Sequence, residues 1–250
     1  MSEYLSGCTV HLAEQSAISP PPDQLWLSAS ETGRLRDMTS PSRRLTYLAG
    51  HWFLRLSLSE RFGGQPHDWR IGQQQSGALL VEQAAISMLE ARKMGVSLSH
   101  SCAQLACAID PDAAVGVDIE RLSEKRSLDD MVALFGSVDL QEHWSKQQPL
   151  SKVQLWYRWW CCYESWVKQQ GRGIDLAEFG RMCLRQGSVE MVSDSIDAAG
   201  RATFWGQYQQ IMLAVTVAHS SAEITVTGST AEAAVGAENS VVLARSQLLV

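Results

Sequence analysis

The sequence predicts an α+β fold, and three features of the 250-residue chain carry this prediction. Residues 152–170 have the apolar periodicity of a long helix, and the glycine-containing segment 171–173 is typical of a helix end. Several short runs of apolar and β-branched residues indicate strands. The apolar run 105–109 is similar to the run 212–217, and each follows a predicted helix. This weak internal similarity indicates two related α+β units.

The N-terminal segment is expected to form a strand, a turn and a long helical region. The strand lies at 8–12, and the three prolines at 20–22 form a turn because they cannot lie inside a helix. Residues 32–61 have a helical pattern that is interrupted at Ser40-Pro41-Ser42. Pro41 is tolerated there because it suits the first turn of a helix.

The middle of the chain is expected to form a β-hairpin. Residues 65–95 are polar and give a weaker pattern, with helical character at 81–92. Two apolar strands follow at 103–109 and 114–120, separated by the turn Asp110-Pro111-Asp112. We expect these two strands to pair with each other.

The C-terminal half is expected to contain two helices and a β-meander. The helices lie at 128–144 and 152–170. Four later segments have the pattern of antiparallel strands: 181–192, 202–209, 211–218 and 222–227. The last twenty residues show no clear period.

The composition predicts a globular chain with a substantial core, because 45% of the residues are hydrophobic and 19% are charged. The formal net charge of −6 argues against general electrostatic binding of nucleic acid. The N-terminus lacks the pattern of a signal peptide, and the longest apolar run, 211–218, is too short to span a bilayer. The six cysteines form no C-x-x-C pair. We therefore expect a cytoplasmic monomer with reduced cysteines and no membrane partner.

Asp118 and Glu120 are the first candidates for chemistry, because residues two apart in a strand project from the same face. Two neighbouring carboxylates repel each other unless positive charge lies between them. Mg²⁺ is a hard cation that prefers oxygen ligands, so a magnesium site is one interpretation. An acid pair on a solvated strand edge is the other.

Glu164 and Lys168 are the second candidates, because they are four residues apart on the predicted helix and share a face. An ordinary surface ion pair is the simplest interpretation. Four tryptophans lie on the same helix: Trp156, Trp159, Trp160 and Trp166. Much of the helix must therefore be covered, and charges embedded among these rings need partners.

Ser99 and His100 are the third candidates, within the segment SLSHS. A hydroxyl and an imidazole at the start of a strand can bind phosphate oxygens. A lone histidine is more often structural, so this segment carries little weight by itself.

Together these segments resemble the surfactin-type 4′-phosphopantetheinyl transferases, the family that includes the second holo-acyl-carrier-protein synthase of enteric bacteria. The resemblance rests on the ordered motifs SLSHS, GVDIE and W-x-x-x-E-S-x-x-K-x-x-G-x-G. The segment from Ser40 to Gly50 is similar to the family's arginine-bearing first helix. The resemblance covers residues 35 to 220.

The resemblance implies two similar, pseudo-symmetric α+β lobes with coenzyme A bound between them. We assign the lobes to residues 1–115 and 116–228 and treat 229–250 as a tail. The implied reaction transfers the 4′-phosphopantetheine arm of coenzyme A to a serine of an apo acyl or peptidyl carrier protein. Adenosine 3′,5′-bisphosphate is released.

The resemblance also implies roles for individual residues. Asp118, Glu120 and Glu164 would hold Mg²⁺ at the coenzyme A pyrophosphate, where it neutralises charge on the reacting phosphate. Lys168 would contact a pyrophosphate oxygen.

The 3′-phosphate of coenzyme A would be bound by a second group of residues. Ser99 and His100 would contact it, together with Arg43 or Arg44.

The general base is Glu164 on this interpretation. Family members also carry an acid upstream of this helix, and either Asp139 or Glu142 could take that place.

Three positions depart from the family pattern. Tyr163 replaces a lysine, His51 replaces an arginine, and 76–78 is the nearest match to a glycine-lysine-proline turn. We expect Tyr163 to contact the ligand, so that Tyr163→Lys would preserve or raise activity. Arg158, Arg172 and His51 are candidates to compensate for the lost cations.

Two functions therefore remain open. The first is an active Mg²⁺-dependent transferase, which the presence of Asp118, Glu120, Glu164 and Lys168 favours. The second is a catalytically weak relative that binds a carrier protein or coenzyme A. A different Mg²⁺ phosphotransferase is a distant third, because the chain has no P-loop or kinase motif.

Overall fold

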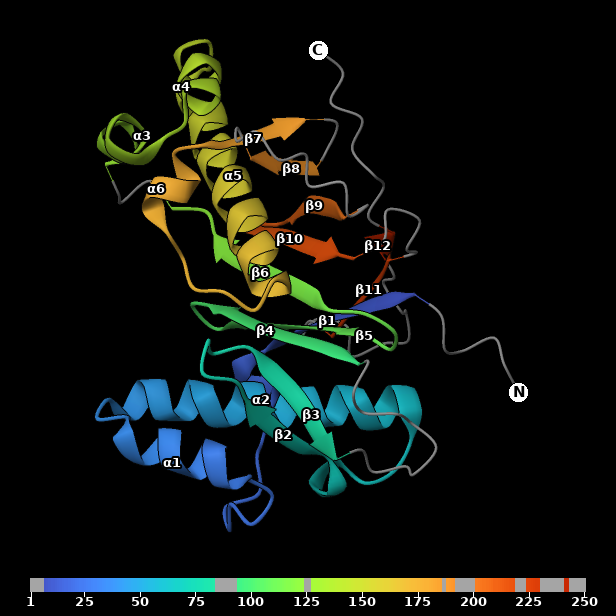
Figure 1. Ribbon diagram of the computed structural model, residues 1–250. Coiled ribbons are helices and arrows are strands. Elements are labelled where there is room, and N and C mark those ends of the chain that lie inside the picture. Colours follow the sequence, from blue (N-terminus) through green and yellow to red (C-terminus); the bar gives the residue numbers. More distant parts are fainter. Residues whose placement is uncertain are drawn as a thin grey trace.

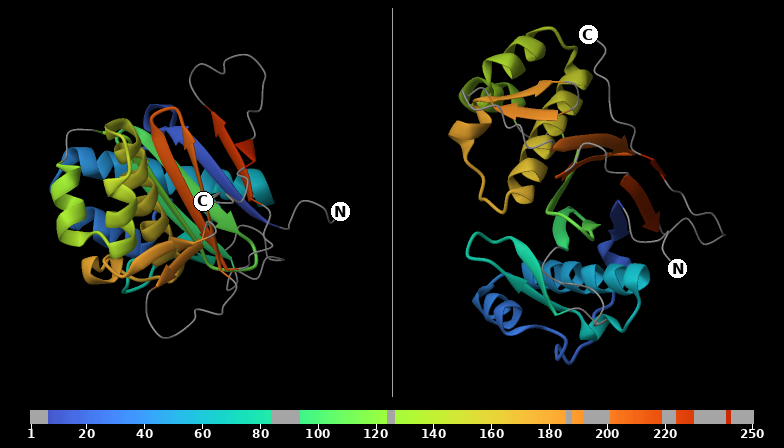
Figure 2. Two further views of the ribbon diagram at one scale, coloured as in Figure 1. Left: turned by 90° about the horizontal axis from the view of Figure 1, so that it is seen from above. Right: turned by 45° about the vertical axis from the view of Figure 1, so that its right-hand side comes forward.

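Two β-sheets pack face to face in the middle of the molecule, and a long helix covers the outer face of each (Figure 1). The two further views in Figure 2 show the same four layers. The structure is a computed structural model that describes residues 7–83, 94–123, 127–185, 188–191, 201–218, 224–229 and 241–242. The predicted α+β class is confirmed.

The larger sheet has five strands in the order β12-β11-β1-β5-β4, and the smaller has three in the order β6-β10-β9. Two separate hairpins, β2–β3 and β7–β8, complete the described strands. The strand bounds are β1 Cys8–Glu14, β2 Arg70–Gln73, β3 Leu79–Gln83, β4 Gly95–Ser101, β5 Gln104–Asp110, β6 Val115–Arg121, β7 Met182–Arg185, β8 Ser188–Met191, β9 Ala202–Tyr208, β10 Ile211–Val217, β11 Ile224–Ser229 and β12 Val241–Val242.

The helices begin and end where local chemistry favours it. Ser28 and Glu31 form a capping box at the start of α1, and Ser40 followed by Pro41 starts α2. Gly171, with a φ of 64°, ends α5. The helix bounds are α1 Ala29–Asp37, α2 Pro41–Phe62, α3 Leu128–Phe135, α4 Val138–Ser145, α5 Pro149–Gln169 and α6 Leu176–Phe179, with 3-10 turns at Gln15–Ala17 and Pro66–Asp68.

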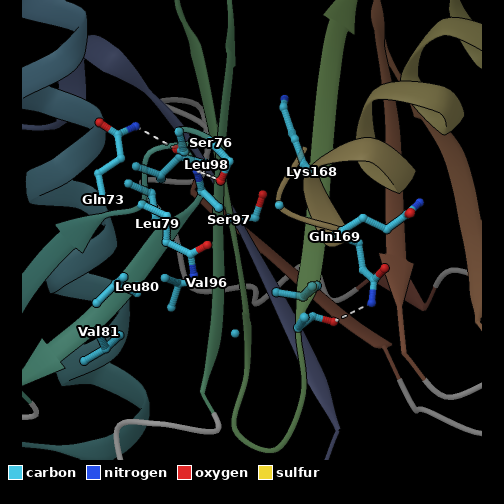
Figure 3. Close-up of a pocket in the computed structure, with 18 of the residues that line it drawn as sticks. Gln73, Ser76, Leu79, Leu80, Val81, Val96, Ser97, Leu98, Lys168 and Gln169 are labelled. Atoms are coloured by element: carbon cyan, nitrogen blue, oxygen red, sulfur yellow. Dashed lines mark hydrogen bonds between the residues drawn. The ribbon is translucent and has the colours of Figure 1, made fainter. Parts of the chain in front are cut away.

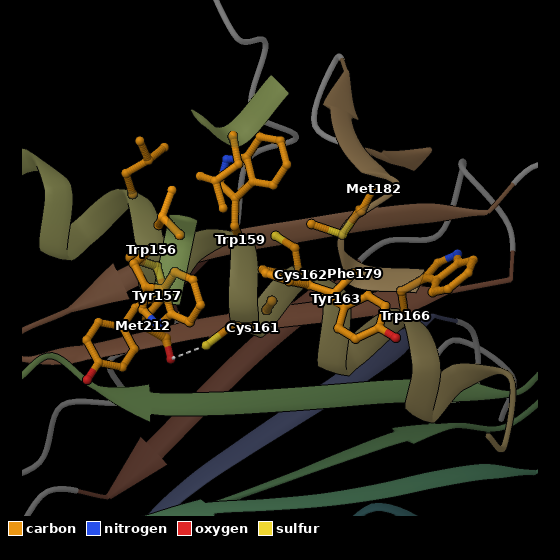
Figure 4. Close-up of a cluster of buried hydrophobic side chains, with 14 of the residues drawn as sticks. Trp156, Tyr157, Trp159, Cys161, Cys162, Tyr163, Trp166, Phe179, Met182 and Met212 are labelled. Atoms are coloured by element: carbon orange, nitrogen blue, oxygen red, sulfur yellow. Dashed lines mark hydrogen bonds between the residues drawn. The ribbon is translucent and has the colours of Figure 1, made fainter. Parts of the chain in front are cut away.

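Three apolar clusters hold these layers together. Leu54 and Leu58 place α2 on the five-stranded sheet. The tryptophan-rich face of α5 packs with Phe179 and Met212 (Figure 4). Between the sheets, Val10 of β1 belongs to the same cluster as the apolar residues of β6 and β10. Each fully buried aliphatic side chain stabilises the fold by about 1.5–3 kcal/mol, so the sheet-to-sheet contact is a strong constraint.

The expected hairpin of 103–109 with 114–120 is wrong. Strand β5 pairs with β4 on one side and with β1 on the other, whereas β6 pairs with β10. The turn after β5 carries the chain from one sheet to the other, and Asp110 Oδ1 accepts the backbone N–H groups of Asp112 and Ala113 there. A local apolar pattern does not reveal such a change of sheet.

The expected four-stranded meander is also wrong. Strands β7 and β8 form their own hairpin, and β9 pairs with β10. Strand β11 lies parallel to β1 in the other sheet. The chain therefore returns its C-terminal strand to the sheet that begins at the N-terminus.

Two predicted helices differ from the structure. The region 128–144 is broken into α3 and α4, because Gly136 follows the end of α3 and Ser137 caps α4. Of the predicted helical stretch 81–92, the described residues up to Gln83 belong to β3, and the others lie outside the described residues. The predicted strand at 8–12 and the predicted helix at 152–170 are confirmed.

The proposed lobes 1–115 and 116–228 and the tail 229–250 stay predictions. Of the tail, the structure describes Ser229 and the short strand β12. No disulfide occurs among the described residues. Among those residues, moreover, we find no helix with the length and apolar character needed to cross a membrane.

Gly116 is expected to control how closely α5 approaches β6. A Cβ atom at this position would lie 1.9 Å from the Ser165 carbonyl oxygen and 2.5 Å from the Gln169 nitrogen. Because backbone atoms cannot move aside cheaply, Gly116→Ala is expected to lower the free energy of unfolding by about 1–3 kcal/mol or more, measured by urea denaturation. Gly33→Ala is the matched control, since a Cβ there meets nothing within 4 Å. Equal stability of the two variants would contradict this close approach.

Candidate active site

Asp118, Glu164 and Lys168 meet where the C-terminal half of α5 lies over β6. Lys168 Nζ is 2.7 Å from Asp118 Oδ1 and 3.5 Å from Glu164 Oε2. It also donates hydrogen bonds to the Val117 carbonyl at 3.2 Å and to Ser99 Oγ at 3.3 Å. The i,i+4 spacing on α5 and the facing strand thus bring two acids to one ammonium group.

The Lys168 ammonium is held charged by its neighbours. Burial opposes the charged form, but the carboxylates of Asp118 and Glu164 outweigh it and raise the pKa of Lys168. Its side chain is 30% exposed, whereas that of Asp118 is 4% exposed. The lysine therefore joins a buried acid to the edge of solvent.

The surroundings of Glu164 shift its pKa upward. Burial, together with the nearby charges of Asp118 and Glu120, raises the pKa of Glu164 to about 7, although Lys168 acts in the opposite direction. A carboxylate with this pKa can accept and release a proton near neutral pH.

Alternate serines of β4 position the acids of β6. Ser99 Oγ donates to Asp118 Oδ1 at 2.8 Å, and Ser101 Oγ donates to Glu120 Oε2 at 2.7 Å. The same hydroxyl groups accept backbone N–H groups of β6, and Ser97 does so at Val117. The two sheets are thus joined by side chains at this edge.

This role of the serines differs from the one expected for Ser99. Its hydroxyl is buried and turned toward Asp118, so the structure does not present it as a contact for phosphate. Sequence reasoning gave Ser97 and Ser101 no individual role beyond the general ability of hydroxyl groups in this segment to bind phosphate. The available signal was the spacing of two between the three serines, which would place all of them on one face of a strand.

The acid group fits a divalent cation by its donor chemistry. Asp118 Oδ2 is buried and has no nitrogen or oxygen donor within hydrogen-bond distance among the described residues, and the Cys161 thiol lies beside Asp118. Hard cations prefer carboxylate oxygens, and added positive charge would oppose both the burial and the charge repulsion that raise the pKa of Glu164. Within the described residues, however, no three side chains are already arranged as a ligand set. Lys168 occupies the position between two of the acids.

Arg43 and His100 lie near this group, whereas Arg44 is used elsewhere. Partial burial and the charges of Lys168 and Arg43 lower the pKa of His100, although this residue is exposed to solvent. Helix α2 contacts strand β4. Arg43 is exposed. The Arg44 guanidinium donates to the carbonyls of Leu35 and Met38 and so binds the end of α1.

A cleft of about 730 Å³ adjoins Lys168 (Figure 3). Its walls are the turn between β2 and β3, the strand β4, and the C-terminal end of α5 through Arg172. Residues 76–78, the nearest match to the family's turn, line it. Arg172 does so too, although it also donates to Glu178 at 2.9 Å. The cleft is therefore bordered by positive side chains from separate parts of the chain.

Tyr163 does not lie where the resemblance placed it. Its hydroxyl donates to the Asp175 carbonyl at 2.6 Å and to Glu178 Oε2 at 3.2 Å. Its ring packs with Phe179 in the apolar cluster (Figure 4). Burial raises the pKa of Tyr163 to about 12, so the phenol stays a hydrogen-bond donor. Tyr163 is not among the residues that line the cleft.

Four further candidates are not part of the acid group. Asp139 and Glu142 are on α4, which packs near the other end of α5 (Figure 1). Arg158 lines a different pocket. His51 is buried 2.6 Å from Glu31 Oε1. Of the predicted compensating cations, the structure brings only Arg172 to the cleft within the described residues.

The position of Tyr163 reverses the expectation for its lysine variant. Tyr163→Phe removes hydrogen bonds to Asp175 and Glu178, at a cost of about 1–3 kcal/mol. Tyr163→Lys also buries an ammonium among aromatic rings, so it should lower the melting temperature further. Thermal unfolding of both variants tests this order. A lysine variant as stable as the native chain would show that position 163 reaches solvent or ligand.

Glu164 is expected to reduce stability at alkaline pH. The pKa of Glu164 is about 7 in the folded protein against 4.5 for an unperturbed glutamate. The stability that its protonation provides is therefore full below pH 4.5 and is lost as the pH rises through about 7. Metal-free Glu164→Gln should thus exceed the native chain by about 1–3 kcal/mol at about pH 8.5, with the gain fading toward about pH 5.

Urea denaturation in a chelating buffer measures this difference, and Glu142→Gln on α4 is the exposed control. A pH-independent difference for Glu164→Gln would exclude a raised pKa.

Comparison with known proteins finds two 4′-phosphopantetheinyl transferases that are similar to this chain. A 4′-phosphopantetheinyl transferase named HetI from Nostoc sp. is 27% identical over 149 residues, which cover 59% of this chain and 61% of the relative. A 4′-phosphopantetheinyl transferase of Bacillus subtilis is 26% identical over 129 residues, which cover 52% of this chain and 53% of the relative. No family model matches the chain.

The chain thus matches little more than half the length of each of these relatives. The similarity agrees with the resemblance that the three motifs gave. The chain is therefore similar, over part of its length, to two 4′-phosphopantetheinyl transferases.

Proposed function

We propose that this protein is an Mg²⁺-dependent 4′-phosphopantetheinyl transferase that uses coenzyme A to modify a serine of an apo acyl or peptidyl carrier protein, and that it acts as a monomer. The observation that carries the proposal is the meeting of Asp118, Glu164 and Lys168 beside a cleft of about 730 Å³. The similarity to two transferases supports the same reaction.

Coenzyme A would lie in the cleft with its phosphates near Lys168. The reason is charge, because Arg34, Lys168 and Arg172 line the cleft and Glu82 is the single acid among its lining residues. Arg43 and His100, on the neighbouring elements, could reach the 3′-phosphate. Charge-assisted contacts to phosphate are worth about 1.5–3 kcal/mol each, so a few of them give useful affinity.

Asp118, Glu120 and Glu164 would hold the metal ion. Bound Mg²⁺ would supply positive charge to the pyrophosphate and to the leaving group. The hydrogen bonds from Ser99 and Ser101 fix the rotamers of Asp118 and Glu120, so these acids need little rearrangement. Lys168 would exchange its contact with Asp118 for one with phosphate.

Glu164 is the best candidate for the general base. In the reaction, the acceptor serine oxygen forms a bond to the phosphorus of the phosphopantetheine arm. The bond from that phosphorus to the oxygen of adenosine 3′,5′-bisphosphate breaks, and the serine proton passes to the base. A carboxylate next to the reacting phosphate can take this proton, and such base assistance is worth about 10²–10⁴-fold in rate.

A catalytically weak relative is the second candidate, and Tyr163 favours it. The family's lysine at this position is replaced by a phenol that points into the apolar cluster. His51, at the position of a family arginine, is buried against Glu31. Two cations are therefore missing, and coenzyme A affinity could fall by about 100-fold.

Intact-mass measurement separates these candidates. The protein is incubated with coenzyme A, Mg²⁺ and a panel of apo carrier proteins, and a transferase adds one phosphopantetheine arm to a carrier. Asp118→Ala is expected to lower the rate by at least about 100-fold, because it removes a buried ligand and the partner of Lys168.

Asp139→Asn and Glu142→Gln are the matched controls, and both should retain the native rate because α4 lies away from the acid group. No mass gain on any carrier, combined with binding of coenzyme A by calorimetry, would favour the weak relative. Full activity of Asp118→Ala would remove Asp118 from the metal site.

A further inference from the structure

A second pocket lies on the other side of α5 from the cleft. It has a volume of about 250 Å³ and is bounded by α5 and by the strands β9 and β10. The lining residues are Gln147, Ser151, Gln154, Leu155, Arg158, Trp205, Gln207 and Met212, and none of them lines the larger cleft. The pocket is therefore a separate feature of the molecule.

Arg158 gives this pocket its positive charge. Its guanidinium lies 4.8 Å from the centre of the Trp205 ring. Within the described part of the chain, no carboxylate is within ion-pair distance of Arg158, and its buried Nε has no hydrogen-bond partner. Partial burial of a cation without an anion is unfavourable, and an incoming anion would relieve this cost.

The other polar groups of the pocket are neutral. Gln154 donates to Gln207 at 3.1 Å, and Gln147 lies at the exposed rim. No acid lines the pocket, whereas amide N–H groups and a guanidinium do. Carboxylate groups match this donor set, because an arginine can bind both of their oxygens.

The pocket lies close to the acid group. Glu120 of β6 is the cross-strand neighbour of Met212 on β10, and Met212 is the neighbour of Gln207 on β9. At about 4.8 Å per strand, Gln207 is about 10 Å across the sheet from Glu120. Paired residues of adjacent strands share a face, so all three lie on the side of the sheet that α5 covers.

We propose that Arg158 binds an acidic side chain of the acceptor protein while the acceptor serine is at the acid group. The inference rests on the proposed function, since it needs a protein acceptor. The cleft on the β4 side would hold coenzyme A, so we place the acceptor at the second pocket, where Arg158 has no ion-pair partner among the described residues. With a chain of net charge −6, such a local cation gives an anionic acceptor a favourable contact.

Steady-state kinetics tests this assignment, with an apo carrier protein that the native chain is able to modify. Arg158→Gln should raise the KM for the acceptor by about 10- to 100-fold, as expected for one charge-assisted contact. The kcat and the KM for coenzyme A should stay within about twofold. Added salt should raise the acceptor KM of the native chain more than that of Arg158→Gln. Arg36→Gln, which removes an exposed charge on α1, is the control.

Arg158→Lys keeps the charge and should retain most of the acceptor affinity. If Arg158→Gln does not fold, a large rise in the acceptor KM of Arg158→Lys would contradict the inference. An unchanged acceptor KM in an active Arg158→Gln variant would overturn this inference but would leave the proposed function standing. An equal rise in the KM for coenzyme A would overturn it too, because Arg158 would then serve the other substrate. A native chain that modifies no carrier refutes the proposed function, and this inference with it.

Discussion

The ion pair between Lys168 and Asp118 is the interaction on which the site depends. Asp118 is almost fully buried, and without the ammonium 2.7 Å away its charge would be unfavourable. The same ammonium is 3.5 Å from Glu164, so a single cation balances acids from a strand and a helix. Any ligand that reaches these acids has to compete with Lys168 or replace it. A site of this kind binds polyanions and metal ions together, since phosphate can take the lysine while a cation takes the carboxylates.

The fold enforces this geometry through close contacts rather than through a rigid loop. Gly116 allows α5 to lie against β6, because a side chain there would meet the helix backbone. The serines of β4 bind the opposite edge of β6 and orient Asp118 and Glu120. A shared apolar cluster holds the two sheets together, and β4, which pairs with β5, contacts β6. The acid group is thus built at the junction of two sheets and one helix, next to the cleft.

The sequence predicted the local features better than the long-range ones. Residues two apart on a strand and four apart on a helix share faces, so the pairs Asp118–Glu120 and Glu164–Lys168 could be recognised. The change of sheet after Asp110 and the parallel pairing of β11 with β1 could not, because strand pairing depends on the whole fold. Tyr163 was misplaced because a motif gives the position of a residue and not the direction of its side chain. Ser101 was overlooked because its role appears only when β4 lies beside β6.

Anomalous diffraction from crystals grown with Mn²⁺ and coenzyme A tests the central claim most directly, since Mn²⁺ takes the same oxygen ligands as Mg²⁺. The account predicts a manganese peak in direct contact with carboxylates of Asp118, Glu120 and Glu164, with Lys168 Nζ moved from Asp118 to a phosphate oxygen. A peak remote from Asp118, with Lys168 still bound to that acid and coenzyme A outside the cleft, would contradict it.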